Sequence, residues 1–391
     1  MRIKRFNADF GNSTYMNLID GYYFDMVTNV VEVSKERAEG IFVTPVENAE
    51  ELYKSILLST EIDGEVRYFL VGEAAEKEVL GNQHINKLHD KTESYITYMM
   101  FLAACAYYYE LKKEEYEIEE ENKIYIESFS TMLPIWLLVK MNKFSEMQNK
   151  MSERFKGTHT FRIETPGMIK ELTVHVEESK CRIEGEVARW AIKKTFTLED
   201  NLEAERFEHH DTIMVDIGGA TVDLALLPAG LKGPRDRNSL AFIEDIPYLA
   251  HLEKLRKEKL IEHFSDVRSL EEFIVRNIGR SRMERKDGIS GKSVDLKEPI
   301  ERALYEYAKI LNAKVEDAFP APKDKVYKYC YIGGVAPIIE KSMEKVIEEK
   351  YGQEIFDENH VFLKDSRKLN LYGLEVLSIH EAAKKQGQAT T

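Results

Sequence analysis

The sequence predicts an α/β protein built from two domains. Segments with β-type alternation and segments with helical periodicity interleave along the whole chain, which is typical of an α/β fold. The length of 391 residues suits two domains, each with its own hydrophobic core. Hydrophobic residues make up 43% of the chain, and 20 Tyr and 18 Phe are among them, so the composition is that of a folded protein.

Charge and composition exclude several classes of partner. The chain has 55 Lys and Arg against 69 Asp and Glu, a net charge of −14, which disfavours direct binding to nucleic acid or to anionic lipid. The cysteines Cys105, Cys181 and Cys330 are far apart, which indicates a reducing compartment. The most apolar segment, 95–109, is too short to span a bilayer and predicts a buried helix. We therefore expect a cytoplasmic protein without a membrane partner.

The order of the predicted elements places three glycine-containing turns directly after strands. The glycine in such a turn lets backbone N–H groups approach an anion without interference from a Cβ atom. The other elements that bear on the argument are a charged loop and an amphipathic helix. In chain order, the predictions are strand 3–8, turn 10–15, strand 16–19, hairpin 212–227, charged loop 280–297, helix 299–319 and strand 326–332.

The first turn is Asp9-Phe10-Gly11-Asn12-Ser13-Thr14. Gly11 permits the tight turn, and the amides of Asn12 and Ser13, with the serine hydroxyl, suit a phosphate group. The Asp9 carboxylate suits a hydrated Mg²⁺ ion at the same place. Taken alone, the segment also fits an ordinary Asp-x-Gly turn.

The second turn lies in the clearest hairpin of the chain, Asp216-Ile217-Gly218-Gly219-Ala220-Thr221-Val222-Asp223. An apolar strand precedes it and another follows it. Gly218 and Gly219 open the backbone to phosphate, Thr221 adds a hydroxyl, and Asp216 emerges where the first strand ends. Because packing alone rarely ends an apolar strand on an aspartate, this segment favours phosphate and metal binding over a plain hairpin.

The third turn is Tyr331-Ile332-Gly333-Gly334-Val335-Ala336-Pro337, a junction of strand, two glycines and helix. A flat purine or a ribose can lie against such a backbone. The segment fits a simple helix start equally well.

Two other segments are better explained without a ligand. Residues 288–293 end in Gly-Lys-Ser, but Lys286 occupies the first glycine position of a P-loop, and no apolar strand precedes it. His209-His210-Asp211 has no second cluster of metal ligands near it in the sequence.

The three turns, in this order, resemble the phosphate-1, phosphate-2 and adenosine motifs of the actin/Hsp70/sugar-kinase superfamily. Segments 68–75, 87–94, 127–136 and 369–373 resemble ParM-like bacterial actins, the filament proteins that segregate plasmids. The resemblance covers nearly the whole chain. It implies a two-domain actin-like ATPase fold of duplicated RNase H-like domains with a nucleotide cleft between them. The implied domains are 1–189 plus 370–391 and 190–369.

The resemblance also implies roles for individual residues. Phosphate and metal would be bound by Asp9, Gly11, Asn12 and Ser13. The β- and γ-phosphates would be bound, and Mg²⁺ and water ordered, by Asp216 with Gly218, Gly219, Ala220 and Thr221. The residues facing the adenosine would be Gly333, Gly334 and Val335. The implied ligands are ATP or ADP and Mg²⁺, with Asp9 and Asp216 as metal ligands.

The position of the water-orienting glutamate is less well defined. Members of the family place it in a Pro-Glu-Gly segment, and the match here is Ile183-Glu184-Gly185-Glu186, without the proline. We favour Glu184, with Glu186 as the competitor; either can also be a charge at the end of a strand. Relatives commonly have a glycine after segment 244–249, and this chain has none there. Lys257 and Glu258 on the following helix are candidates for base or ribose contacts, or a solvated face.

The function that the resemblance implies is ATP-dependent polymerisation into dynamic cytoplasmic filaments that segregate plasmid DNA. ATP hydrolysis would destabilise the filament. The partners would be further copies of the chain and a DNA-bound ParR-like adaptor, because the charge of −14 disfavours direct contact with DNA. The alternative is a monomeric small-molecule kinase of the same superfamily, which would share the nucleotide segments.

Overall fold

The computed structural model describes residues 1–77, 83–84, 91–117, 120–286 and 291–389. The chain divides into two compact units. Unit 1 comprises Met1–Leu133, Met141–Ile183 and Leu374–Thr391, and unit 2 comprises Pro134–Lys140 and Glu184–Gly373. The chain therefore passes between the units at four points. The predicted domain limits, 1–189 plus 370–391 and 190–369, stay a prediction; the units group residues 134–140, 184–189 and 370–373 differently.

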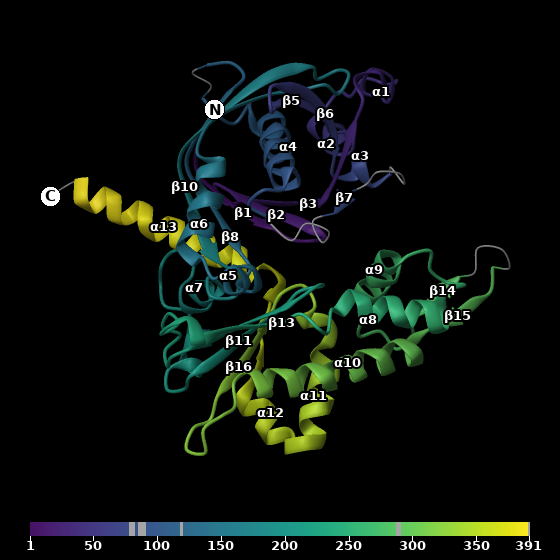
Figure 1. Ribbon diagram of the computed structural model, residues 1–391, viewed down its shortest axis with the longest axis vertical. Helices are drawn as coiled ribbons and strands as arrows, with labels where there is room; N and C mark the ends of the chain where they lie inside the picture. Colours follow the sequence, from purple (N-terminus) through teal and green to yellow (C-terminus); the bar gives the residue numbers. More distant parts are fainter. Residues whose placement is uncertain (78–82, 85–90, 118–119, 287–290, 390–391) are drawn as a thin grey trace. The chain divides into compact units, whose positions relative to one another are not determined.

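Unit 1 is organised around one mixed sheet with the strand order β3-β2-β1-β8-β10-β9-β5-β6-β4-β7 (Figure 1). Strand β1 pairs antiparallel with β2 and parallel with β8, and β8 pairs parallel with β10. The strands are β1 (Arg2–Phe10), β2 (Thr14–Ile19), β3 (Tyr22–Val27), β4 (Asn29–Val33), β5 (Leu57–Ile62), β6 (Glu65–Val71), β7 (Gln83–His84), β8 (Lys123–Leu133), β9 (Gly157–Ile163) and β10 (Lys170–Ile183).

Helices cover both faces of strand β1. On one face, Phe6 packs against Phe101 of α4, with the ring centroids 5.8 Å apart. On the other face, the Asn7 side chain donates a hydrogen bond to Glu375 of α13 at 2.5 Å. Helix α4 is apolar all round and its residues are mostly buried, as the sequence predicts for segment 95–109. The helices are α1 (Lys35–Gly40), α2 (Ala49–Tyr53), α3 (Glu73–Glu76), α4 (Tyr95–Lys112), α6 (Phe144–Phe155) and α13 (Leu369–Ala389), which begins in unit 2.

Unit 2 contains a five-stranded sheet with the order β13-β12-β11-β16-β17. Strand β11 pairs antiparallel with β12 and parallel with β16, and β16 pairs parallel with β17. This is the same order and the same set of directions as β3-β2-β1-β8-β10 of unit 1. The strands are β11 (Thr212–Ile217), β12 (Val222–Leu227), β13 (Leu240–Ile243), β16 (Lys328–Ile332) and β17 (His360–Phe362).

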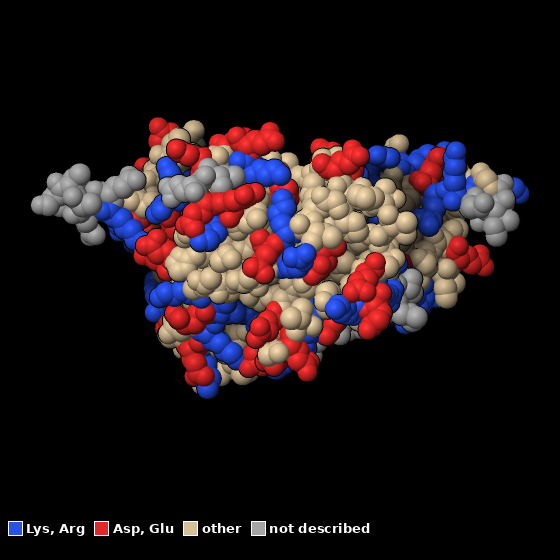
Figure 2. All heavy atoms as spheres, turned by 90° about the horizontal axis from the view of Figure 1, so that it is seen from above, with Lys and Arg blue, Asp and Glu red and all other residues tan. Residues whose placement is uncertain are grey.

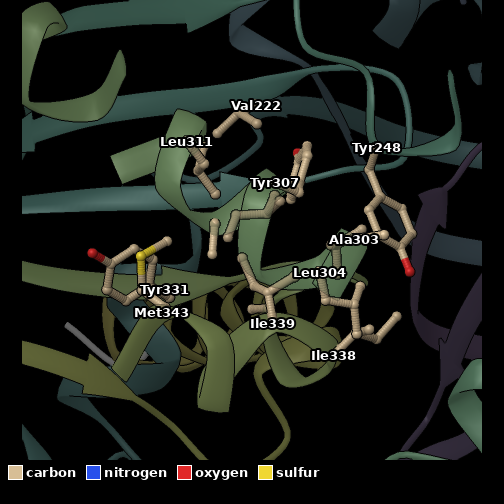
Figure 3. Packing of buried hydrophobic residues seen from close by; sticks show 14 of the residues in the cluster. Val222, Tyr248, Ala303, Leu304, Tyr307, Leu311, Tyr331, Ile338, Ile339 and Met343 are labelled. Carbon is tan, nitrogen blue, oxygen red and sulfur yellow. The ribbon is translucent and has the colours of Figure 1, made fainter. Parts of the chain in front are cut away.

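The core of unit 2 lies between this sheet and helices α10 and α11. Tyr307 and Leu311 of α10 and Ile339 of α11 pack together under Val222 of β12 (Figure 3). These side chains recur at helical spacing, so one face of each helix is apolar. The helices of unit 2 are α5 (Ile135–Met141), α7 (Ala188–Lys193), α8 (Tyr248–Leu255), α9 (Val267–Asn277), α10 (Lys297–Ala318), α11 (Ala336–Tyr351) and α12 (Gln353–Asn359).

Most of the predicted elements are confirmed. The hairpin predicted at 212–227 is formed by β11 and β12, and the helix predicted at 299–319 is α10. The prediction of a charged loop over 280–297 is wrong in part. The short strands β14 (Glu284–Lys286) and β15 (Ser293–Asp295) pair there as an antiparallel hairpin, and residues 287–290 lie outside the described residues. Alternation is not detectable in such short charged strands.

The surface carries both signs of charge. In Figure 2, acidic and basic side chains are interspersed over the visible face, and no large area of one sign stands out. Among the residues that the structure describes, no helix combines the length and the apolar character needed to cross a membrane.

Candidate functional site

The turn between β11 and β12 is half-buried, and backbone hydrogen bonds hold its conformation. The Gly218 N–H donates to the Thr221 carbonyl at 3.0 Å and closes the turn. The Leu249 N–H at the start of α8 donates to the Gly219 carbonyl at 2.9 Å. A Cβ atom at Gly219 would lie 3.0 Å from the Leu249 side chain, so helix α8 packs closely on this glycine. The predicted phosphate-binding residues 218–221 therefore form one ordered turn.

Asp216 lies next to the third glycine segment. Its neighbour on the parallel strand β16 is Ile332, which Gly333 follows. Gly333 has φ +90°, and a Cβ atom there would lie 2.4 Å from Asp216 Oδ1. Glycine at this position therefore leaves room for the carboxylate. The second predicted motif and the first glycine of the third are thus in direct contact, which the sequence did not indicate.

Asn370, near the start of α13, completes the surroundings of Asp216. Its Nδ2 donates to Asp216 Oδ2 at 2.6 Å, and its Oδ1 accepts from the Gly185 N–H at 2.9 Å. Asn370 lies in segment 369–373, which resembles the ParM-like actins, but the sequence alone gives this residue no role. The contact joins residues 154 positions apart in the chain.

Asp223, the last residue of the second motif, is buried at the start of helix α5. Its two carboxylate oxygens accept the N–H groups of Ile135 at 2.8 Å and Trp136 at 3.0 Å. Burial raises the pKa of Asp223 well above its ordinary value, and the like charges of Glu184 and Asp216 raise it further. The two backbone N–H groups oppose this rise without cancelling it. The charges of Glu184 and Asp216 therefore both act on Asp223.

We expect the stability advantage of the wild type over Asp223→Asn to shrink as the pH rises. The folded-state pKa of Asp223 is above its unfolded value, so its contribution to stability is complete below the unfolded pKa and is lost as the pH rises through the folded pKa. Urea unfolding midpoints of both proteins, from about pH 4 to about pH 8, measure the difference. An advantage that grows with pH would show instead that the ionised carboxylate is what stabilises the start of α5.

The two candidate glutamates differ in their surroundings. Glu186 Oε1 accepts a hydrogen bond from Arg189 Nε at 2.5 Å, and both side chains are largely buried. Glu184 instead contributes to the raised pKa of Asp223, so its charge lies near the acidic group described above. Gly185, between the two glutamates, has φ +72°, and a Cβ atom there would lie 3.6 Å from Asp216 Cβ. The two glutamates thus differ in their contacts, and which of them orients the water stays a prediction.

The first predicted turn, in unit 1, has a comparable construction. A Cβ atom at Gly11 would lie 2.4 Å from the Thr14 carbonyl oxygen, so the turn requires glycine. Thr28 fixes its backbone by donating from Oγ1 to the Gly11 carbonyl at 2.9 Å and from its N–H to the Ser13 carbonyl at 3.1 Å. Asp9 is buried at the end of β1, while Asn12 and Ser13 are half-buried.

Gly334 and Val335 lead into helix α11, and polar residues missed by the sequence analysis lie near them. A Cβ atom at Gly334 would lie 3.8 Å from Arg367 Nε. Burial raises the pKa of Glu271 on α9, and the nearby Arg367 and Arg268 oppose the rise. No local pattern distinguishes these side chains from solvated charges. Lys257 and Glu258, the candidates named from the sequence, are exposed on the π-helical turn Arg256–Leu260.

The donor chemistry of Asp9 and Asp216 fits Mg²⁺. In nucleotide sites this ion is held by one or two carboxylates together with phosphate oxygens and water. Asp216 Oδ2 already accepts from Asn370, which fixes the orientation of the carboxylate. In the described part of the chain, no three His, Cys, Asp or Glu side chains gather in a way that could hold a metal ion. An Mg²⁺ ion at Asp216 would therefore take most of its ligands from phosphate oxygens and water.

Comparison with solved structures identifies the fold. The ParM protein of Bacillus thuringiensis with ADP matches with a TM-score of 0.65 and 14% identity, over 97% of this chain and 99% of that chain. A ParM filament structure from Clostridium botulinum matches with a TM-score of 0.64 and 13% identity, over 97% and 100%. The chain therefore has the two-domain actin-like α/β fold that the sequence predicts.

A closer likeness identifies the family. The crystal structure of the actin-like protein Alp7A matches with a TM-score of 0.94 and 55% identity, over 100% of this chain and 99% of that chain. The family model described as the Alp7A C-terminal domain matches residues 211–366. Among curated protein sequences, none matches the chain. The chain belongs to the Alp7A family of ParM-like bacterial actins.

Proposed function

We propose that this chain is an ATPase that polymerises into dynamic cytoplasmic filaments and segregates plasmid DNA, with ATP hydrolysis destabilising the filament. The observation that carries the proposal is the group formed by Asp216, Gly333 and Asn370 at the end of β11, in a chain with 55% identity to Alp7A. Among the relatives that share the fold, Bacillus thuringiensis ParM is described with ATP and with ADP, and Clostridium botulinum ParM as a filament of 15 strands.

The proposed roles follow from the chemistry of each residue. Backbone amides of turn 218–221 bind phosphate, and the turn at Gly11, Asn12 and Ser13 has the same role by resemblance. Asp9 and Asp216 are the proposed Mg²⁺ ligands, and Gly333, Gly334 and Val335 face the adenosine. When bound, Mg²⁺ neutralises charge on the phosphate oxygens. Glu184 orients the attacking water and Asp216 supports it, so the reaction depends mainly on positioning and charge.

Self-association and an adaptor are the proposed interactions. Copies of a chain with a net charge of −14 repel one another, so assembly should depend strongly on salt and on divalent cations. The same charge disfavours direct contact with DNA, which supports a separate DNA-bound ParR-like adaptor.

Light scattering and phosphate release, followed together after addition of ATP and Mg²⁺ to micromolar protein, test this function. We expect scattering to rise only with nucleotide, phosphate release to lag behind it, and electron micrographs to show filaments. Absence of polymer at every salt and protein concentration, with rapid phosphate transfer to a small metabolite, would establish the monomeric kinase instead.

Substitution of the two glutamates separates assembly from hydrolysis in the same assay. We expect Glu184→Gln to assemble with ATP but to release phosphate about 100-fold more slowly, because the water loses its orienting carboxylate. Its filaments should persist after the wild type has disassembled. Glu186→Gln is the matched control: it loses the ion pair with Arg189 and should hydrolyse ATP within a few-fold of the wild type. Slow phosphate release by Glu186→Gln, with normal release by Glu184→Gln, would show that Glu186 orients the water.

A further inference from the structure

Asn370 makes two hydrogen bonds at once, one as a donor and one as an acceptor. Its Nδ2 donates to Asp216 Oδ2 at 2.6 Å while its Oδ1 accepts from the Gly185 N–H at 2.9 Å. An ionised carboxylate accepts but cannot donate, so an aspartate in this place would keep only the hydrogen bond from the Gly185 N–H. Asn370 is buried, with 8% of its surface exposed, so an alternative partner from solvent is largely excluded.

The two partners of Asn370 belong to the two groups proposed for hydrolysis. Asp216 is the proposed metal and water carboxylate at the end of β11. Gly185 directly follows Glu184, so a hydrogen bond to its N–H fixes the backbone that carries the proposed water-orienting side chain.

Close packing of α13 holds Asn370 itself in place. Gly373, one turn further along the helix, is so close to residues 187–188 that a Cβ atom there would lie 2.1 Å from the Val187 carbonyl oxygen. The first turn of α13 is therefore pressed against the segment that follows Glu184. The amide of Asn370 then has little freedom to leave its two partners.

We propose that Asn370 is a positioning residue for ATP hydrolysis, which fixes the Asp216 carboxylate and the Glu184–Gly185 backbone relative to one another. The inference rests on the proposed function of Asp216 and Glu184. It adds a residue that acts through its hydrogen bonds to Asp216 and to the Gly185 N–H. A displacement of about 1 Å in such groups lowers a rate by about 100-fold.

The test compares kcat and KM for ATP in Asn370→Ala and Asn370→Asp. Alanine loses both hydrogen bonds, whereas aspartate keeps the acceptor for the Gly185 N–H and loses the donor to Asp216. We expect kcat to fall about 100-fold in both variants, with KM for ATP changed no more than a few-fold for alanine. Thermal unfolding of each variant shows that it is folded at the assay temperature.

Asn312→Ala is the matched control. Asn312 is also a buried asparagine of unit 2 whose Nδ2 donates to a carboxylate, Glu316 Oε1, at 2.9 Å, but it lies on α10. We expect it to lower the unfolding temperature and to leave kcat within a few-fold of the wild type. Loss of kcat in Asn312→Ala equal to that in Asn370→Ala would reduce the role of Asn370 to general stability and overturn the proposal.

Two further outcomes distinguish this inference from the proposed function. If Asn370→Asp hydrolyses ATP like the wild type, the hydrogen bond to Asp216 is not needed, and the proposal is wrong. If Asp216→Ala is inactive while Asn370→Ala is as active as the wild type, the proposed function stands and the role of Asn370 fails alone. If Asp216→Ala itself hydrolyses ATP normally, the proposed function fails together with the inference that rests on it.

Discussion

Replacing Asp216 with alanine is expected to lower phosphate release at least about 100-fold. The substitution removes the carboxylate that we propose as a Mg²⁺ ligand and support for the attacking water. It also leaves the Nδ2 group of the buried Asn370 without its acceptor, so the segment after Glu184 loses part of its anchoring. Phosphate release during single turnover measures the first effect. Binding of a fluorescent ATP analogue, with and without Mg²⁺, measures how far the affinity for nucleotide depends on the metal.

Asp245→Ala is a suitable control for Asp216→Ala. Asp245 is an exposed carboxylate of unit 2 that forms an ion pair with Lys314, and that ion pair lowers its pKa. Because exposed ion pairs contribute little, we expect this variant to assemble and to hydrolyse ATP like the wild type. Normal phosphate release by Asp216→Ala, with unchanged dependence on Mg²⁺, would show that another residue holds the metal.

Replacing Gly333 with alanine is expected to have the largest effect on the fold of unit 2. The added Cβ atom would lie 2.4 Å from Asp216 Oδ1, 2.7 Å from the Ile217 carbonyl oxygen and 2.9 Å from the Ile217 N atom. Two of these atoms are backbone of Ile217, which pairs with Val222 of β12 and whose carbonyl accepts from the Val335 N–H, so they cannot move without disturbing these contacts. In addition, alanine is strained at φ +90°. We expect destabilisation on the order of 4–5 kcal/mol and loss of nucleotide binding.

Gly352→Ala separates the two causes of this effect. Gly352 has φ +91°, nearly the angle of Gly333, but a Cβ atom there would meet nothing within 4 Å. The variant therefore reports backbone strain alone, which costs about 1–3 kcal/mol. Urea unfolding of both variants gives the difference that is due to crowding at Asp216. Equal midpoints for the two would contradict the close approach of Gly333 to Asp216.

The sequence predicted those parts of the site that depend on neighbouring residues. The run of apolar strand, Asp216, two glycines and a second apolar strand is a local pattern, and β11 and β12 follow it closely. The α/β class followed from the strands and helices that interleave along the chain, and the order of three such turns carried the resemblance to the superfamily. The actin-like fold was then expected from the resemblance, and comparison with solved structures confirms it.

The contacts of the second and third turns with the rest of unit 2 could not be predicted from the sequence. Asn370 and Asp216 are 154 positions apart, and no spacing rule connects an asparagine at a helix start with a distant strand end. Asp223 is the last residue of the second motif, but its role at the start of α5 depends on the position of that helix, which follows β8 and is distant in sequence. Glu271 and Arg367 likewise look like ordinary surface charges until α9 and the segment before α13 are folded.

The close approaches at a few glycines also identify the positions at which relatives can be aligned. Every other amino acid carries a Cβ atom. Where that atom would lie within 2.5 Å of a backbone atom or a carboxylate, any replacement of the glycine destabilises the fold. Gly11, Gly167, Gly333 and Gly373 are of this kind, whereas Gly40 faces open space. Between this chain and the ParM structures, identity falls to 13–14% and most residues have changed. These four glycines are therefore more dependable reference points for an alignment than the charged or apolar residues around them.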